Sequence, residues 1–200
     1  KLFKSFNRNY DLINLDLSNF EENIAKTNQK NQTVTSNQKS NMANIHQSLI
    51  EAKNSEDLIY FVEDDYIHNK DSLNEMVLTF ERISSQVKND IFLCPTDYPY
   101  LYSKAEPTQI FLGSNYHWRK VNETLCTFLT SKEMVNKHWN ILKSMCEIEH
   151  YPFEKPLHDI YEKELCISPV PSLAIHCTNI NSIFGLSPNV NWKKLWDENK

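Results

Sequence analysis

Glycine is nearly absent from this chain, which has 2 glycines among its 200 residues. The loops that cradle phosphate groups in the Walker and dinucleotide-binding motifs need several glycines at fixed spacing. Only glycine lets the backbone approach a phosphate closely enough in those motifs. The sequence therefore excludes both kinds of glycine-rich phosphate loop.

Long apolar runs and paired cysteines are missing as well. No stretch approaches the roughly 20 apolar residues that cross a bilayer, so we expect no transmembrane segment. No signal peptide is visible, although the chain begins at Lys1 and not at Met, which leaves a trimmed start open. The five cysteines contain no C-x-x-C pair, which argues against a zinc knuckle or a disulfide framework. Scattered reduced thiols predict a cytoplasmic protein. A position at the inner face of the membrane is compatible with this prediction.

The balance of charge and composition is that of a globular domain. The formal net charge is -5, which argues against a nucleic-acid-binding surface. Hydrophobic residues make up 40% of the chain and charged residues 24%. Because this length supports one domain with a real core but hardly two, we expect a single domain over residues 1–200.

The most informative stretch is residues 58–66, where five apolar residues run into three carboxylates. The apolar part is typical of a strand buried on both faces. Glu63, Asp64 and Asp65 follow it, and burying unpaired carboxylates is costly. We therefore expect them at the mouth of the sheet, where open α/β sheets bind their ligands.

Three neighbouring carboxylates repel one another, and a bound cation is the simplest way to hold them together. Hard divalent ions prefer oxygen ligands, so the triplet is a candidate metal and phosphate site. A solvated acidic turn is the alternative, and the residues alone leave both open. A helix is expected next, with Ser72 and Glu75 at capping-box spacing. A strand, an acidic turn and a helix in this order form the geometry of a ligand site.

Helices and strands alternate along the chain. Apolar residues at helical spacing predict helices over 41–53 and 73–83, and 90–94 is typical of a short buried strand. This alternation predicts an α/β fold, Rossmann-like, with a mostly parallel central sheet flanked by helices. Residues 26–40 are polar and predict an exposed, flexible loop, either a linker or a lid. The other expected elements are a strand over 10–17, helices over 20–25, 131–145 and 157–165, a hairpin over 109–121, a strand over 173–175 and a closing segment with Trp192 and Trp196 at helical spacing.

Two later segments carry side chains suited to a ligand. The tyrosine-rich loop at 95–102 contains two prolines, which argue against a helix. Its rings could stack on a base or sugar, with Asp97 accepting from hydroxyls, or could simply cover the end of the sheet. Arg119 and Lys120 in the hairpin are the best-placed cations for a diphosphate, because arginine grips phosphate through two hydrogen bonds. The late strand delivers His176.

In this order the segments resemble nucleotide-sugar glycosyltransferases of the GT-A fold, in particular bacterial members similar to family two. Residues 60–66 look like the Asp-x-Asp strand end of those enzymes, and 173–176 resembles their late histidine segment. The other matched segments are 95–99, 118–122 and 126–128, and the likeness covers residues 40–195. The resemblance implies a single GT-A-like domain that uses Mn²⁺ or Mg²⁺ and a nucleoside-diphosphate sugar.

The resemblance also implies roles at the donor site. Asp65 would bind the metal that bridges the two donor phosphates, and His176 would be a further metal ligand or a phosphate contact. Glu63 and Asp64 would face the ribose or the sugar. The metal would neutralise the leaving diphosphate.

The general base is less defined, because the match is loose. Asp159 matches the acidic position at a helix start that serves as base in inverting members, and Glu154 is the alternative. The implied acceptor is a saccharide or a lipid-linked saccharide, as in the synthesis of surface polysaccharides or glycoconjugates. Such an acceptor is compatible with peripheral membrane association.

The chain departs from the family at its N-terminus. Residues 5–8 look faintly like the base-binding loop, but too little chain precedes 10–17 for the usual helix. We therefore expect a trimmed or rebuilt nucleotide subsite. Two other functions stay open: a non-catalytic carbohydrate- or partner-binding domain derived from a transferase, and a metal-dependent nucleotidyl or phosphoryl transferase, which would need a second acidic cluster.

Overall fold

The computed structural model describes residues 6–15, 36–103, 105–147, 152–177 and 190–200. The predicted helix at 20–25 and most of the predicted loop at 26–40 lie outside these residues. The part of the loop that is described, residues 36–40, is helical and opens α2. The described part of the predicted strand at 10–17 has no strand structure, so that prediction is wrong for residues 10–15.

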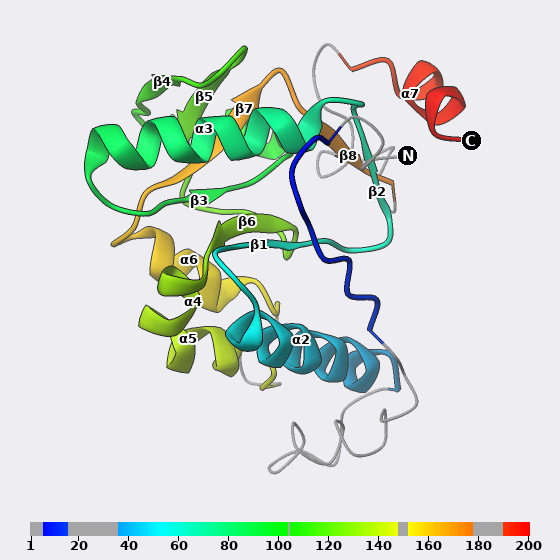
Figure 1. Cartoon of the computed structure of the whole chain (residues 1–200), viewed down its shortest axis with the longest axis vertical. Coiled ribbons are helices and arrows are strands. Elements are labelled where there is room, and N and C mark those ends of the chain that lie inside the picture. Colours follow the sequence, from blue (N-terminus) through cyan, green and yellow to red (C-terminus); the bar gives the residue numbers. More distant parts are fainter. Residues whose placement is uncertain (1–5, 16–35, 104, 148–151, 178–189) are drawn as a thin grey trace.

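The helices lie on both faces of a central sheet (Figure 1). They are α2 (Ser36–Asn54), α3 (Ser72–Val87), α4 (Lys132–Lys137), α5 (Trp139–Ser144), α6 (Lys155–Tyr161) and α7 (Trp192–Asn199), with a 3-10 helix, η3 (Pro99–Ser103). The strands are β1 (Leu58–Phe61), β2 (Tyr66–His68), β3 (Phe92–Leu93), β4 (Ile110–Leu112), β5 (His117–Lys120), β6 (Phe128–Ser131), β7 (Cys166–Val170) and β8 (Ala174–His176).

The α/β class is confirmed, but the prediction of a mostly parallel sheet is wrong. The large sheet has the order β1-β6-β3-β7-β5-β4, and β2 pairs with β8 in a second sheet. In the large sheet only β3 and β7 run parallel, and the other neighbours are antiparallel. Helix–strand alternation predicts parallel pairs. The alternation does not indicate that β4 and β5 form an antiparallel hairpin. It also does not indicate that β6 lies between β1 and β3 and runs antiparallel to both.

Strand β1 packs against an apolar cluster on each face, with Ile59 and Phe61 on one side and Leu58 and Tyr60 on the other, but the prediction that it is fully buried is wrong. It lies at one edge of the large sheet, and its four residues are half-buried. Val62, directly after it, is 47% exposed. Within the described residues, β6 covers β1 along one side only.

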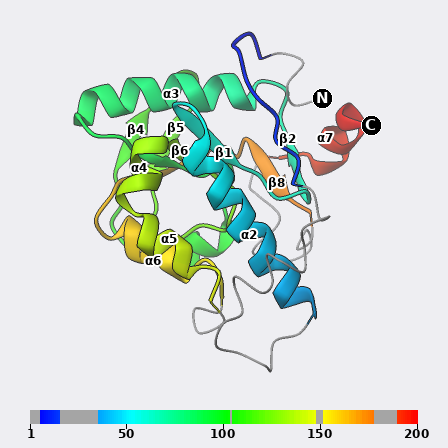
Figure 2. The ribbon, with the colours of Figure 1, turned by 60° about the horizontal axis from the view of Figure 1, so that its bottom comes forward.

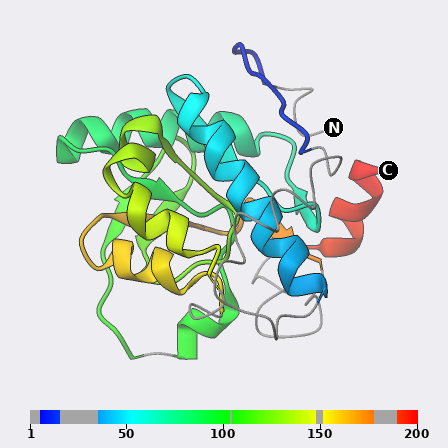
Figure 3. The same ribbon diagram turned by 90° about the horizontal axis from the view of Figure 1, so that it is seen from below.

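Two apolar clusters fill the space between the sheet and its helices. Helix α3 covers one face, where Met76, Phe80 and Trp118 pack together, as the helical spacing of α3 predicts. Helices α2, α5 and α6 cover the other face, where Phe128 and Leu157 belong to the core. Figures 2 and 3 show α2 running diagonally across this face beside the pair α5 and α6. Within the described ranges, no helix combines the length and apolarity needed to cross a membrane.

Helix α3 also anchors the β4–β5 hairpin through Glu75. The Glu75 carboxylate accepts hydrogen bonds from the backbone N–H groups of Ser114 and Asn115 (3.1 and 2.8 Å) and from Trp118 Nε1 (3.2 Å). A Cβ on Gly113 would lie 2.3 Å from the same indole nitrogen, so only glycine fits this turn. The predicted hairpin is therefore confirmed, and it is tightly held.

The predicted capping box at the start of α3 is wrong, because both of its side chains have other partners. Glu75 points to the hairpin, and the Ser72 hydroxyl donates to the backbone carbonyls of Asn69 and Leu173. At the start of α4, Ser131 is the helix cap, and its Oγ accepts a hydrogen bond from Met134 N at 3.1 Å.

Three other element predictions need correction. The predicted helix 131–145 is split into α4 and α5 at His138. The tyrosine-rich loop contains the 3-10 helix η3, which begins at Pro99, a position where the missing N–H of proline costs nothing. The helix predicted over 157–165 runs from Lys155 to Tyr161, and β7 follows it unpredicted.

Candidate functional site

The acidic triplet lies between β1 and β2, as its position after the apolar run predicts. Strand β2 pairs antiparallel with β8, and in that register Tyr66 faces His176. This pairing brings Asp65 Oδ2 to 2.8 Å from His176 Nε2, across 111 positions of sequence. The Cys177 N–H also donates to the Asp65 carbonyl oxygen at 2.8 Å. The two residues assigned to the metal are therefore direct neighbours.

The imidazole of His176 is held in a fixed orientation. Its ring stacks on Tyr66, with centroids 4.9 Å apart and an interplanar angle of 20°. The Tyr66 hydroxyl in turn lies 2.6 Å from that of Tyr98, so the supporting ring is fixed too. His176 is only 8% exposed. The two-stranded sheet of β2 and β8 thus holds Asp65 and His176 in fixed positions.

Glu63 forms two hydrogen bonds with Thr127, which lies on the loop before β6. The Glu63 N–H donates to Thr127 Oγ1 (3.0 Å), and the Thr127 hydroxyl donates to Glu63 Oε2 (3.2 Å). Burial, and then the nearby charge of Asp65, raise the pKa of Glu63 to about 7, against the lowering effect of the Thr127 hydrogen bond. The carboxyl group of Glu63 therefore changes between its neutral and charged forms near neutral pH.

This raised pKa predicts a pH-dependent stability. Between pH 4.5, the ordinary value, and pH 7 the unfolded chain loses the Glu63 proton while the folded protein keeps it. The folded state is therefore penalised as the pH rises through this window, by on the order of 3 kcal/mol at most above it. We expect Glu63→Gln, which carries no charge, to be more stable than wild type at pH 8 and nearly equal to it at pH 4.

Urea unfolding in EDTA at the two pH values measures this difference. Asp159→Asn, which removes an exposed carboxylate, serves as the matched control and should show no comparable pH-dependent gain. An equal stability difference at pH 4 and pH 8 for Glu63→Gln would contradict the prediction, because it would mean that Glu63 has an ordinary pKa.

The two candidate bases lie in different surroundings. Glu154, at the start of α6, is half-buried, and its charge contributes to raising the pKa of Glu63. Asp159, one turn further on, is exposed and pairs with Lys155 at 3.2 Å. Asp64 is exposed in the acidic turn, and its charge also raises the Glu63 pKa. Asp64 and Glu154 therefore both lie near enough to Glu63 for their charges to raise its pKa.

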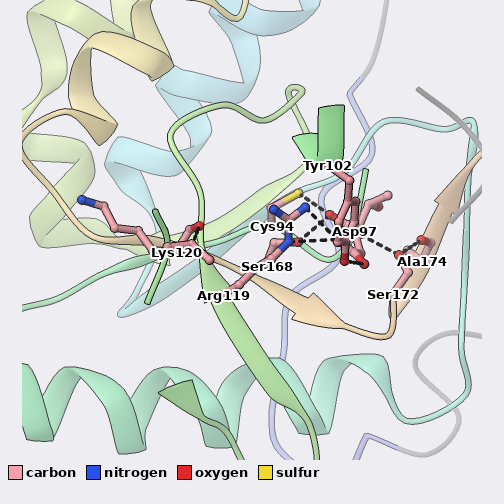
Figure 4. Close-up of polar contacts among 10 residues, drawn as sticks. Cys94, Asp97, Tyr102, Arg119, Lys120, Ser168, Ser172 and Ala174 are labelled. Carbon is pink, nitrogen blue, oxygen red and sulfur yellow. Dashed lines mark hydrogen bonds and ion pairs between the residues drawn. The ribbon is translucent and has the colours of Figure 1, made fainter. Parts of the chain in front are cut away.

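Asp97 and Arg119 bind each other, as Figure 4 shows. Arg119 Nε and Nη2 donate to Asp97 Oδ1 at 3.1 and 2.8 Å. Asp97 is 1% exposed and Arg119 8%. The Tyr102 hydroxyl donates to Asp97 Oδ2, and the Arg119 guanidinium lies 4.3 Å from the Tyr102 ring centroid. In this arrangement both charges are already satisfied by protein groups.

The rest of this network fastens the tyrosine-rich loop to the sheet. The Asp97 N–H donates to Ser172 Oγ (2.8 Å), and the Ser168 hydroxyl donates to the Thr96 carbonyl oxygen (2.8 Å). These serines come from β7 and from the segment between β7 and β8. Figure 4 labels both serines beside the Asp97–Arg119 pair. The network supports a structural reading of this loop.

Asp65 Oδ2 and His176 Nε2 lie 2.8 Å apart, which is the distance of a hydrogen bond between the two side chains. Two ligand atoms about 2.1 Å from Mg²⁺ in adjacent octahedral positions are about 3 Å apart, so a metal ion bound by both side chains would replace this hydrogen bond at a similar separation of the two atoms. Within the described ranges, however, no group of three or more His, Cys, Asp or Glu side chains could hold a metal ion. A metal at this pair needs further ligands, such as the phosphates and water that Mg²⁺ commonly retains.

Shape gives no independent indication of the site. Two surface hollows lie where the end of α3 meets the start of α4, and both are lined by Asp90 and Glu133. Neither is lined by any of the residues assigned to the site from sequence. The chemistry of the acidic turn, and not the depth of a cavity, identifies the candidate site.

Sequence reasoning did not identify the residues that support the site. Thr127 lies within segment 126–128, one of the segments that resemble the transferase family. That resemblance was the one feature of the sequence that could have indicated a role for Thr127 at the site. Tyr66 follows the triplet directly, but no pattern indicates that it stacks on His176. Comparison with known protein families, with curated proteins and with solved structures gave no match.

Proposed function

We propose that this chain is a metal-dependent glycosyltransferase that moves a sugar from a nucleoside-diphosphate donor to a hydroxyl acceptor. The observation that carries the proposal is the contact between Asp65 and His176, 2.8 Å apart, at the end of an apolar strand. Glu154 lies close enough for its charge to raise the pKa of Glu63. A carboxylate–imidazole pair beside further carboxylates suits metal-assisted departure of a diphosphate.

Each residue then has a defined task. Mn²⁺ or Mg²⁺ bound at Asp65 and His176 would supply Lewis-acid neutralisation of the diphosphate leaving group. Thr127 holds Glu63, so that the carboxyl group faces the donor in one orientation. Glu154 takes the proton of the acceptor hydroxyl, because it is near enough for its charge to act on Glu63, whereas Asp159 is exposed and engaged with Lys155. The acceptor is a saccharide or lipid-linked saccharide in the synthesis of surface polysaccharides or glycoconjugates.

Calorimetric titration with UDP, GDP and CMP, each with and without Mn²⁺, tests the proposal. We expect one nucleotide to bind only when the metal is present, because the acidic turn repels a diphosphate without it. Such a result would also identify the donor class. No binding by the folded protein under any of these conditions would overturn the proposal.

The choice of base gives a separate prediction. Glu154→Gln should keep donor binding and lose transfer by about a hundredfold or more, the usual contribution of a general base. Asp159→Asn should retain near wild-type turnover. Measuring product formation with each variant decides between the two carboxylates. Normal turnover by Glu154→Gln together with loss in Asp159→Asn would assign the base to Asp159.

A non-catalytic binding domain derived from a transferase is the second candidate. The observation that favours it is the burial of Arg119 against Asp97, which removes the best-placed cation from a diphosphate site. Metal-independent carbohydrate binding with no nucleotide response would favour this function. A nucleotidyl or phosphoryl transferase has less support, because no metal-binding group is found in the described part of the chain, and it would need two.

A further inference from the structure

Strand β4 is the last strand at one end of the large sheet, and its outer edge is open. It pairs with β5 on one side, and no strand of the described chain pairs with its other side. Ile110 is 59% exposed and Leu112 54%, whereas Phe111 between them packs against the cluster beneath α3. Figure 1 shows β4 at the outside of the molecule. An open edge of this kind is a template for another strand.

The backbone groups that β4 leaves free follow from its hydrogen bonds within the hairpin. The Gln109 carbonyl oxygen and the Gly113 N–H, four positions apart, both bond across the hairpin, at 2.8 and 2.9 Å. In an antiparallel pair, every second residue directs its N–H and C=O to the partner strand, and the residues between direct both groups away. Phe111 therefore bonds across the hairpin as well. Ile110 and Leu112 present their N–H and C=O groups to the outside.

This pattern is complementary to itself. When two copies of β4 lie antiparallel about a two-fold axis at Phe111, Ile110 of each copy is opposite Leu112 of the other. Each of these two pairs exchanges two hydrogen bonds, so every outward group of both residues is paired. The aliphatic side chains of each pair become neighbours on one face, with Cβ atoms about 5 Å apart. Because a two-fold contact closes on itself, association stops at the dimer.

The distribution of charge favours this edge of the sheet over the other one. Residues 107–112 contain no charged side chain, so two copies of β4 meet without repulsion between like charges. The opposite edge strand, β1, has exposed acids near both ends, Asp57 before it and Asp64 after it. Two antiparallel copies of β1 would bring these acids toward each other, which is unfavourable. Charges commonly protect edge strands from pairing, and β4 lacks them.

We propose that β4 is a self-association surface through which two copies of this chain join their large sheets into one continuous sheet. The contact is short, since β4 has 3 residues, whereas stable complexes bury about 1,200–2,000 Å² in total. The association is therefore weak and depends on protein concentration. It makes no use of Asp65 or His176, so it goes beyond the proposed function and does not depend on it.

Sedimentation velocity over a rising series of protein concentrations, in EDTA and without nucleotide, tests the pairing. We expect wild type to pass from monomer toward dimer. Ile110→Lys/Leu112→Lys places lysines opposite each other in both cross-strand pairs and should weaken association by about tenfold or more. The matched control is Leu12→Lys/Ile13→Lys, which makes the same change in charge at two similarly exposed residues outside β4 (58% and 51%). It should associate like wild type.

Two further variants test the register and the backbone bonds. Ile110→Lys/Leu112→Glu places a lysine opposite a glutamate in both pairs, so association should return to near the wild-type level. Leu112→Pro removes an outward N–H from each copy while the bonds to β5 remain, and a proline is tolerated at such a position of an edge strand. It should weaken association like the double-lysine variant. Thermal unfolding checks that each variant is folded.

Three results would each overturn the pairing. The first is a wild-type protein that stays monomeric at every concentration, which would leave the edge to an extended segment of a different protein. The second is a double-lysine variant that associates as well as wild type, or a control variant that loses association equally. The third is loss in the double-lysine variant without recovery in Ile110→Lys/Leu112→Glu, which would show that the two copies do not meet in this register.

Discussion

Asp65→Ala is expected to weaken metal-dependent nucleotide binding by at least about a hundredfold, since removal of even an outer partner of a metal ligand costs ten- to a hundredfold. The substitution removes the carboxylate that pairs with His176. The backbone contact with Cys177 uses the Asp65 carbonyl oxygen, which alanine retains. The fold should therefore persist while the site is lost. Calorimetry with Mn²⁺ and the nucleotide that binds wild type measures the affinity, and thermal unfolding checks the fold.

Asp71→Ala is the control for the change in charge. Asp71 is an exposed carboxylate just before α3 and its side chain makes no cap hydrogen bond. This variant should bind nucleotide like wild type, whereas His176→Ala should behave like Asp65→Ala. A folded Asp65→Ala protein that still binds nucleotide in a metal-dependent manner would show that the metal lies elsewhere.

The acidic turn illustrates what local sequence can predict. Five apolar residues followed by three carboxylates can fold in few ways, because the apolar strand must be packed and the charged groups must stay near water. The triplet follows β1, and Asp64 is exposed, as expected, but Glu63 and Asp65 are half-buried. The helical spacing in α2 and α3 was equally informative, since each helix buries one face on the sheet.

Long-range pairing is what the sequence could not reveal. The contact of Asp65 with His176 depends on the register of β2 with β8, and no local pattern records which strands become neighbours. The edge position of β1 has the same origin, because no local pattern shows which strands pair along its two edges, and within the described residues only β6 pairs with it. A parallel sheet was predicted from the order of helices and strands along the chain. Whether neighbouring strands run parallel or antiparallel depends on which strands pair, and the order does not show this. The resemblance, and not periodicity, pointed to His176.

Asp97 and Arg119 show a second limit. A lone acid and a lone base, 22 positions apart, are each compatible with a ligand, and their sequence context does not indicate that they bind each other. Burial decides between the two readings. At 1% and 8% exposure, each charge needs a partner within the protein, and the two groups form an ion pair with each other.

This pairing predicts a large loss of stability for Asp97→Ala. The variant leaves the Arg119 guanidinium buried without its carboxylate, and breaking a buried ion pair in this way costs about 3–5 kcal/mol. It also removes the acceptor of the Tyr102 hydroxyl. Urea unfolding of Asp97→Ala against wild type measures the loss. A residue that served only to contact a donor hydroxyl would cost far less stability when it was truncated.

The double variant Asp97→Leu/Arg119→Met separates a structural pair from a ligand-binding pair. Replacing a buried ion pair by apolar residues of similar volume is often neutral, so the double variant should recover most of the stability that Asp97→Ala loses. If the pair is structural, the stable double variant should also bind nucleotide and Mn²⁺ like wild type, because Asp65 and His176 are untouched. Recovered stability with lost nucleotide binding would return Arg119 to the diphosphate site. A double variant as unstable as Asp97→Ala would mean that the hydrogen bond from Tyr102 to the Asp97 carboxylate, and not the ion pair, holds this loop on the sheet.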